Sequence, residues 1–127
     1  MIHMTKILIA EDENDIRDLI TFTLRFANYD VVTASNGEEA VTQARNEVPD
    51  LILMDVRMPR MTGYEACAAI KLEPNLKNIP IIFLSAKGQD SEIQAGLQAG
   101  GVEYLLKPLA PDQLTAHIQA ILAQHGR

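Results

Sequence analysis

The sequence has 127 residues, 47% apolar and 22% charged, which is the size and balance of one compact domain. Its net charge of −6 opposes the counterion release that drives binding to nucleic acids, and its single cysteine, Cys67, excludes a disulfide framework or a thiolate zinc site. The first apolar run, residues 7–10, is too short for a signal peptide, and no run reaches 18 residues. We therefore expect one cytoplasmic domain over residues 1–127, with no second domain and no direct contact with nucleic acid or membrane.

Strands and helices are predicted to alternate along the chain. Apolar runs typical of strands cover residues 6–10, 29–34, 51–54, 81–84 and 104–106. Helical spacing follows the first strand from Ile16 to Ala27, and Asn36 with Glu39 three residues later indicates a capped start for a second helix. Further helices are predicted at about residues 64–72 and 90–97 and from Pro111 onward, the fourth being weakened by glycines.

Five strands that alternate with five helices predict an α/β fold, a doubly wound (βα)5 sandwich with a parallel sheet and helices on both faces. The first, third and fourth strands are apolar at nearly every position, as strands covered on both sides must be, whereas the second and fifth carry polar residues that suit sheet edges. The simplest strand order is therefore 2-1-3-4-5, which is flavodoxin-like. Ligands of such sheets bind beyond the carboxyl ends of the strands, here between the first and third.

Acidic residues stand at that predicted crevice. Glu11, Asp12 and Glu13 follow the first strand and Asp55 follows the third. Two like charges about 5 Å apart repel by roughly 3 kcal/mol at an effective dielectric of about 20, so a cation is expected among them. Oxygen ligands without nearby histidine or cysteine favour a hard ion, and Mg²⁺ more than Ca²⁺.

The same edge of the sheet gains two further polar groups, because Ser85 ends the fourth strand and Lys107 follows the fifth. A carboxylate nucleophile, a divalent ion, an ammonium and a hydroxyl are the groups needed to transfer a phosphoryl group onto an aspartate and hold its oxygens. The sequence thus predicts phosphoryl transfer onto an aspartate at this edge of the sheet.

Four segments resemble the receiver domain of two-component response regulators, the CheY-like family. They are ILIAEDE around Glu11 and Asp12, LILMDVRMPRMTG from Leu51 to Gly63, FLSA around Ser85, and YLLKP from Tyr104 to Pro108. The resemblance covers essentially the whole chain, and four motifs in the right order at four strand ends are far more specific than any one alone.

The resemblance implies a role for each matching residue. Asp55 would be the phosphoacceptor and Lys107 would contact the phosphoryl group. Glu11, Asp12, Asp55 and the backbone carbonyl of Arg57 would bind Mg²⁺, for which Mn²⁺ could substitute, with Asp12 the more direct ligand of the acidic pair.

Ser85 and Tyr104 would form the switch that follows phosphorylation, with Pro108 usually cis in the family. The resemblance further implies a histidine kinase or a histidine phosphotransfer protein as donor. The readout surface would be the fourth helix, fifth strand and fifth helix, which could contact a downstream protein or effector domain, or pair two copies of the chain. Such a domain modifies itself and turns over no substrate, so it is not expected to be an enzyme in the ordinary sense.

Four positions depart from the family pattern, are variable in the family or act indirectly. The acidic pair is Glu-Asp where Asp-Asp is commoner, and the longer Glu11 could reach the metal through water. Arg57 and Lys87 occupy the variable positions that flank the phosphoryl group, and we expect these two cations to tune its lifetime. Gly63, just before a helix, is predicted to supply a turn conformation closed to other residues.

Other functions fit the sequence less well. A haloacid dehalogenase-type phosphatase needs a second acid two residues after its nucleophile, where Arg57 stands. Nucleotide or flavin binding would call for a glycine-rich phosphate loop, and the loop after the first strand is acidic. An unphosphorylated pseudo-receiver that serves as a protein-binding adaptor remains the alternative, although Asp12, Asp55 and Lys107 are all present.

Overall fold

The computed structural model describes residues 4–86 and 88–125. Five strands alternate with five helices as predicted. The strands are β1 (Lys6–Ala10), β2 (Asp30–Ala34), β3 (Leu51–Asp55), β4 (Ile81–Ser85) and β5 (Glu103–Leu106), and the helices are α1 (Asn14–Phe26), α2 (Gly37–Glu47), α3 (Gly63–Lys71), α4 (Asp90–Gln98) and α5 (Pro111–Gln124).

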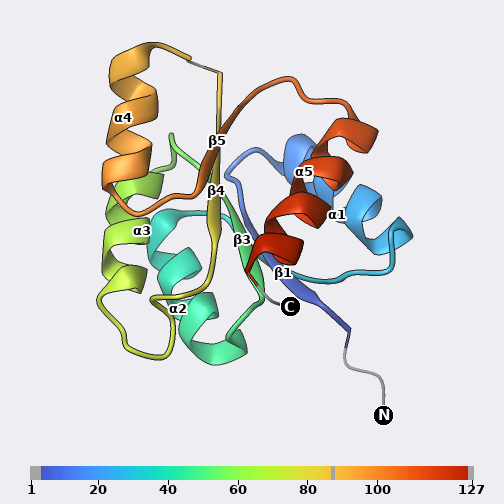
Figure 1. Cartoon of the computed structure of the whole chain (residues 1–127), viewed down its shortest axis with the longest axis horizontal. Coiled ribbons are helices and arrows are strands. Elements are labelled where there is room, and N and C mark those ends of the chain that lie inside the picture. Colours follow the sequence, from blue (N-terminus) through green and yellow to red (C-terminus); the bar gives the residue numbers. More distant parts are fainter. Residues whose placement is uncertain (1–3, 87, 126–127) are drawn as a thin grey trace.

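The strands form one parallel sheet in the order β2-β1-β3-β4-β5, which confirms the predicted order. All residues of β3 and β4 are buried, because helices cover the sheet on both faces. Figure 1 shows α2, α3 and α4 on one face and α1 and α5 on the other. Each layer packs its own apolar cluster against the sheet, one around Phe83, Ile70 and Ala44 and the other around Leu24, Leu53 and Ile118.

The helix starts follow local rules. The Asn36 side chain accepts a hydrogen bond from the Glu39 backbone N–H at 2.8 Å, so the predicted cap of α2 is confirmed. Thr62 and Glu65 form a reciprocal capping box that fixes the first turn of α3. Pro111 occupies the first turn of α5, where its missing N–H costs nothing. Among the described residues, no helix is both long and apolar enough to cross a bilayer.

Candidate functional site

The carboxyl ends of four strands bring together the residues that the sequence singled out. Glu11 follows β1, Asp55 and Ser85 are the last residues of β3 and β4, and Lys107 follows β5. Glu11, Asp55 and Ser85 expose only 0%, 5% and 3% of their surface. Because burial of unpaired polar groups is costly, these side chains must be held by one another or by a ligand.

Lys107 joins the two buried acids. Its Nζ lies 2.6 Å from Oε1 of Glu11 and 3.1 Å from Oδ1 of Asp55. The other oxygen of Glu11, Oε2, accepts a hydrogen bond from the backbone N–H of Glu13 at 3.3 Å. The backbone of Glu11 is fixed as well, since Nη1 of Arg17 donates to its carbonyl at 2.9 Å. Both oxygens of the Glu11 carboxylate therefore have a partner within the protein.

The acidic cluster has the composition of a hard-cation site. Glu11, Asp12 and Asp55 each offer one carboxylate oxygen, and these oxygens all lie within 4.8 Å of one another. Asp12 is exposed, whereas the other two are buried. An all-oxygen set that is open on one side fits Mg²⁺, which retains several waters and binds to one or two carboxylates. The side chain of Arg57 is exposed.

The charges in this cluster shift the ionisation of its members. Burial, together with the adjacent Glu11 charge, raises the pKa of Asp55 to about 7, although Lys107 acts against the shift. Burial alone would lower the pKa of Lys107, but its hydrogen bond to Glu11 and the charges of Asp55 and Glu11 outweigh burial, so that pKa is raised. Lys107 is therefore a permanent cation, while Asp55 is poised to lose its proton near neutral pH.

The predicted switch residues lie on β4, which pairs with the strand of Asp55, and on β5 beyond it. Ser85 pairs with Leu106 in the β4–β5 register, one residue before Lys107. Tyr104 is half-buried, and its ring lies 6.4 Å from that of Phe83. The Lys107–Pro108 peptide bond is cis, as the resemblance implied. Lys87, which the sequence suggested as a tuning residue, lies outside the described residues.

Gly63 corrects one prediction. It was expected to supply a backbone turn closed to other residues, but it is the first residue of α3, and the described glycine with positive φ is Gly100. The reason for glycine is close approach, since a Cβ there would lie 2.3 Å from the carbonyl oxygen of Asp55. The start of α3 can lie against the phosphoacceptor strand only because this side chain is absent.

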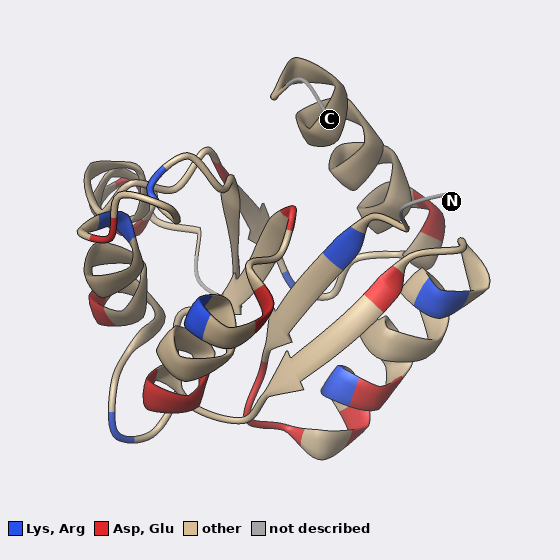
Figure 2. Cartoon of the chain, turned by 90° about the horizontal axis from the view of Figure 1, so that it is seen from below, with Lys and Arg blue, Asp and Glu red and all other residues tan. Residues whose placement is uncertain are grey.

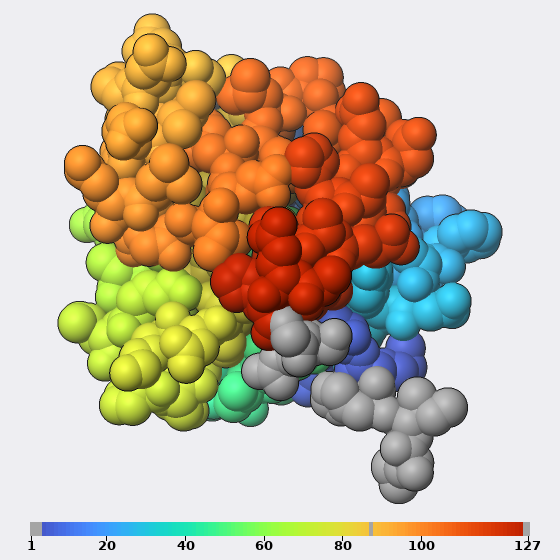
Figure 3. Space-filling view, viewed as in Figure 1, coloured from blue at the N-terminus to red at the C-terminus, as the bar shows by residue number. Residues whose placement is uncertain are grey.

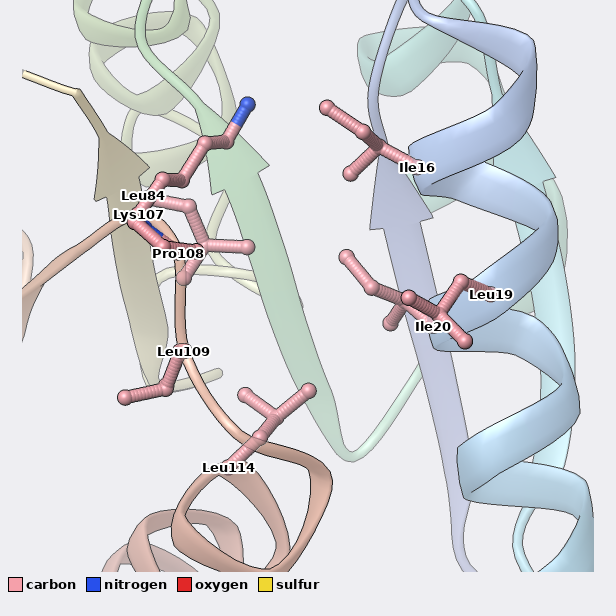
Figure 4. Close-up of a pocket in the computed structure, with 8 residues that line it drawn as sticks. All are labelled: Ile16, Leu19, Ile20, Leu84, Lys107, Pro108, Leu109 and Leu114. Atoms are coloured by element: carbon pink, nitrogen blue, oxygen red, sulfur yellow. The ribbon is translucent and has the colours of Figure 1, made fainter.

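Two features were not foreseen from the sequence. An apolar cavity of about 170 Å³ lies beside Lys107, between α1 and the segment that joins β5 to α5. Figure 4 shows Ile16, Leu19 and Ile20 of α1 on one side of it and Lys107 and Pro108 on the other. The second feature is Tyr64, whose hydroxyl contacts both α4 and Tyr104. Its place in the first turn of a helix was the only sequence signal, and that place also suits an ordinary core residue.

Known proteins are similar to this chain in sequence and fold. The response regulator receiver domain family matches residues 7–119. The chain is 39% identical, over 92% of its length, to the alkaline phosphatase synthesis transcriptional regulatory protein PhoP of Bacillus subtilis, and 40% identical over the same share to the probable transcriptional regulator ycf27 of Pyropia yezoensis. It spans about half the length of these curated relatives, 48% and 47%.

Solved structures agree with this family. The chemotaxis protein CheY4 of Vibrio cholerae superposes with a TM-score of 0.90 at 34% identity, covering 94% of this chain and 99% of that one. The receiver domain of the sensor histidine kinase PA1611 of Pseudomonas aeruginosa, solved with a magnesium ion coordinated in its active-site cleft, superposes with a TM-score of 0.89 at 33% identity, covering 95% and 99%. The match in sequence, strand order and clustered carboxylates shows that this chain belongs to the response regulator receiver domain family.

Proposed function

We propose that this chain accepts a phosphoryl group on Asp55 from a histidine kinase or a histidine phosphotransfer protein, with Mg²⁺ bound by Glu11, Asp12, Asp55 and the carbonyl of Arg57. Response regulators receive phosphoryl groups from histidine kinases and act on downstream targets, and receiver domains bind Mg²⁺ in their active sites. The observation that carries the proposal is the contact of Lys107 with both Asp55 and Glu11, beside a cluster of three carboxylates.

The reaction transfers a phosphoryl group from a histidine nitrogen of the donor to a carboxylate oxygen of Asp55. A carboxylate oxygen of Asp55 attacks the phosphorus of the donor phosphohistidine, a new O–P bond forms, and the N–P bond breaks with its electron pair returning to the imidazole. Bound Mg²⁺ would supply positive charge to the phosphoryl oxygens. The attack requires the ionised carboxylate, which a pKa of about 7 makes available at neutral pH.

Ser85 at the end of β4 and Lys107 after β5 complete the site. The ammonium already lies 3.1 Å from Oδ1 of Asp55, so a phosphoryl group added to that carboxylate would be within its reach. Glu11 also holds the ammonium in place, at 2.6 Å. We assign to the Ser85 hydroxyl, at the end of the adjacent strand, a hydrogen bond to the phosphoryl group that draws the segment leading to α4 toward the site.

The donor must approach over the carboxyl edge of the sheet, because Asp55 exposes only 5% of its surface. Helix α1 starts at that edge, and farther along it Leu19, Phe22 and Phe26 are 60%, 70% and 82% exposed. Leu19 also lines the cavity beside Lys107, so apolar surface continues from the site along α1. Exposed aromatic groups of this kind mark protein-binding surfaces. We assign this α1 surface (Leu19, Phe22 and Phe26) to the donor.

The output surface is proposed to be α4, β5 and α5, which Figure 3 shows side by side on one face of the molecule. From Gln113 to Gln124, α5 carries no lysine, arginine, aspartate or glutamate, and most of this helix is uncharged in Figure 2. Surfaces depleted of charge are easier to bury against a protein partner. A downstream protein, or a second copy of the chain, would bind here.

Incubation with acetyl phosphate and Mg²⁺ tests the function. Intact-protein mass spectrometry should show the addition of one phosphoryl group to the wild-type protein and none to Asp55→Asn. An adaptor that works without phosphorylation would use the same surfaces, and it would give no addition in either protein. Addition to both proteins equally would place the acceptor elsewhere and contradict the proposal.

A further inference from the structure

Tyr64 connects three elements through one hydroxyl group. From the first turn of α3, its hydroxyl donates to the backbone carbonyl of Glu92 in α4 at 3.0 Å, and it lies 3.2 Å from Oε2 of the same residue. The hydroxyl oxygens of Tyr64 and Tyr104 are 3.4 Å apart. Glu92 and Tyr104, which are 28 and 40 residues from Tyr64 in sequence, thus both contact the hydroxyl oxygen of Tyr64.

The number of available protons decides which hydroxyl donates in each hydrogen bond of Tyr64. A phenol has one proton to donate and lone pairs to accept with. If Tyr64 gives its proton to Glu92, the Tyr104 hydroxyl can complete the chain only by donating to Tyr64. Each bond in such a chain polarises the next, so the position of Tyr104 and the position of α4 are not independent. The 3.4 Å contact is long for two hydroxyl groups, which makes it the weaker of the two bonds and the one that breaks first.

Ring packing places the same residues in one layer. The centroid of the Tyr64 ring lies 5.1 Å from that of Phe83 on β4, in an edge-on contact. The centroid of the Tyr104 ring, on the neighbouring strand β5, lies 6.4 Å from that of Phe83. Gly96 of α4 lets the Tyr104 ring lie against that helix, since a Cβ at Gly96 would be 3.0 Å from Cδ2 of Tyr104. Tyr104 therefore contacts α4 through its ring and Tyr64 through its hydroxyl.

We propose that Tyr64 is a positioning residue that couples the orientation of Tyr104 to the start of α4 through this shared hydroxyl. With the hydroxyl in place, α4 and the inward-lying Tyr104 stabilise each other. Without it, both are released together. The coupling is a property of the unphosphorylated protein. Only its use in signalling, in which Ser85 draws on the segment before α4, rests on the proposed function.

The chain contains three tyrosines in all, so the signal of each tyrosine can be identified. Protein labelled with 3-fluorotyrosine should give three ¹⁹F signals, and each Tyr→Phe variant identifies one by its loss. Tyr64→Phe removes the hydroxyl and keeps the ring that packs on Phe83. Tyr29→Phe is the matched control, since Tyr29 packs in the apolar cluster on the opposite face of the sheet.

In Tyr64→Phe, the Tyr104 signal should shift, and the amides of residues 93–98 should exchange hydrogen about tenfold faster, the size expected for one lost hydrogen bond. Exchange in α2 and α5 should stay unchanged, as should both readouts in Tyr29→Phe. Two results would overturn the proposal: a Tyr104 signal that stays in place, or faster exchange spread evenly over all helices, which would show a merely structural role.

Beryllofluoride with Mg²⁺ separates this proposal from the proposed function. In the wild-type protein the reagent should move the Tyr104 signal, whereas Tyr64→Phe should move that signal with no reagent present. A wild-type protein that ignores beryllofluoride, while Tyr64→Phe still moves Tyr104, would refute the phosphoryl switch and leave the coupling intact. A Tyr104 signal that stays in place in Tyr64→Phe, while beryllofluoride still moves it in the wild-type protein, would refute the coupling and leave the phosphoryl switch intact.

Discussion

The ammonium of Lys107 lies closer to Glu11, at 2.6 Å, than to the proposed phosphoacceptor Asp55, at 3.1 Å. Glu11 is fully buried and Lys107 is partly buried, with 19% of its side chain exposed. In the resting protein this lysine therefore neutralises a buried acid that also belongs to the proposed metal site. Glu11, in a position where the family commonly has Asp, thus shares Lys107 with the neighbouring carboxylate of Asp55.

Replacement of Lys107 by methionine should lower the free energy of unfolding, because the buried Glu11 charge would lose its partner. It would leave Glu11 unpaired beside Asp55, and loss of one member of a buried ion pair typically costs about 3 kcal/mol. Urea unfolding at pH 8 should show this loss of free energy of unfolding, with Lys77→Met as the control, because Lys77 is exposed. Equal stability of the two variants would mean that the ion pair contributes nothing.

Asp55→Asn should stabilise the protein in the absence of Mg²⁺, and more so at high pH. Burial and the Glu11 charge raise the pKa of Asp55 to about 7 in the folded protein, whereas in the unfolded chain it ionises near pH 4. Below pH 4 the carboxyl is protonated in both states. As the pH rises to 7, the unfolded chain loses its proton first, so the folded state becomes progressively less stable relative to it.

The stabilising effect of Asp55→Asn should therefore be about 2 kcal/mol larger at pH 8 than at pH 5. Thermal or urea unfolding across this range measures it, and Asp18→Asn on the exposed side of α1 serves as the control. A stabilisation that does not change with pH would contradict the raised pKa of Asp55.

Binding of Mg²⁺ should release a proton at low pH. Because the metal needs an ionised carboxylate, it competes with the proton on Asp55 below pH 7. Calorimetric titrations at pH 6 in buffers of different ionisation heat should show close to one proton released, and titrations at pH 8.5 almost none. Asp12→Ala should weaken binding by about tenfold or more, while Glu13→Ala, also exposed but outside the cluster, should not. Equal losses in both variants would remove Asp12 from the metal site.

The α1 surface should matter for protein donors alone. Phe22→Ala combined with Phe26→Ala should slow phosphoryl transfer from a phosphorylated histidine phosphotransfer protein by about tenfold or more, since exposed aromatic anchors dominate many interfaces. Phosphorylation by acetyl phosphate, which needs no docking surface, should proceed at the wild-type rate. Leu72→Ala is the control, because Leu72 is 83% exposed on the opposite layer. Unchanged transfer from the protein donor would exclude this surface.

The fold and most of the site followed from patterns that are local in sequence. Uninterrupted apolar runs identified β3 and β4 as central strands, and the topology then placed Glu11, Asp55, Ser85 and Lys107 at one edge. Contacts across the layers could not be predicted in the same way. The reason for Gly63 depends on how closely α3 lies against the carbonyl of Asp55, and no local pattern records that distance.

The pairing of Lys107 with Glu11 could not be predicted from local patterns either. Side-chain length and burial together decide which acid lies nearer to the lysine. Tyr64 was missed since its hydroxyl partners, Glu92 and Tyr104, lie on other elements. Such features depend on the packing of layers, and a single sequence shows only which layers exist.

The central claim concerns where the phosphoryl group is attached. After incubation with acetyl phosphate and Mg²⁺, borohydride reduction would convert a phosphorylated aspartate into homoserine, which peptide mass spectrometry can locate. We predict homoserine at position 55 in the wild-type protein, with a much lower yield in Asp12→Ala. Reduction at any other carboxyl group, or at none while the protein remains folded and binds Mg²⁺, would contradict the account.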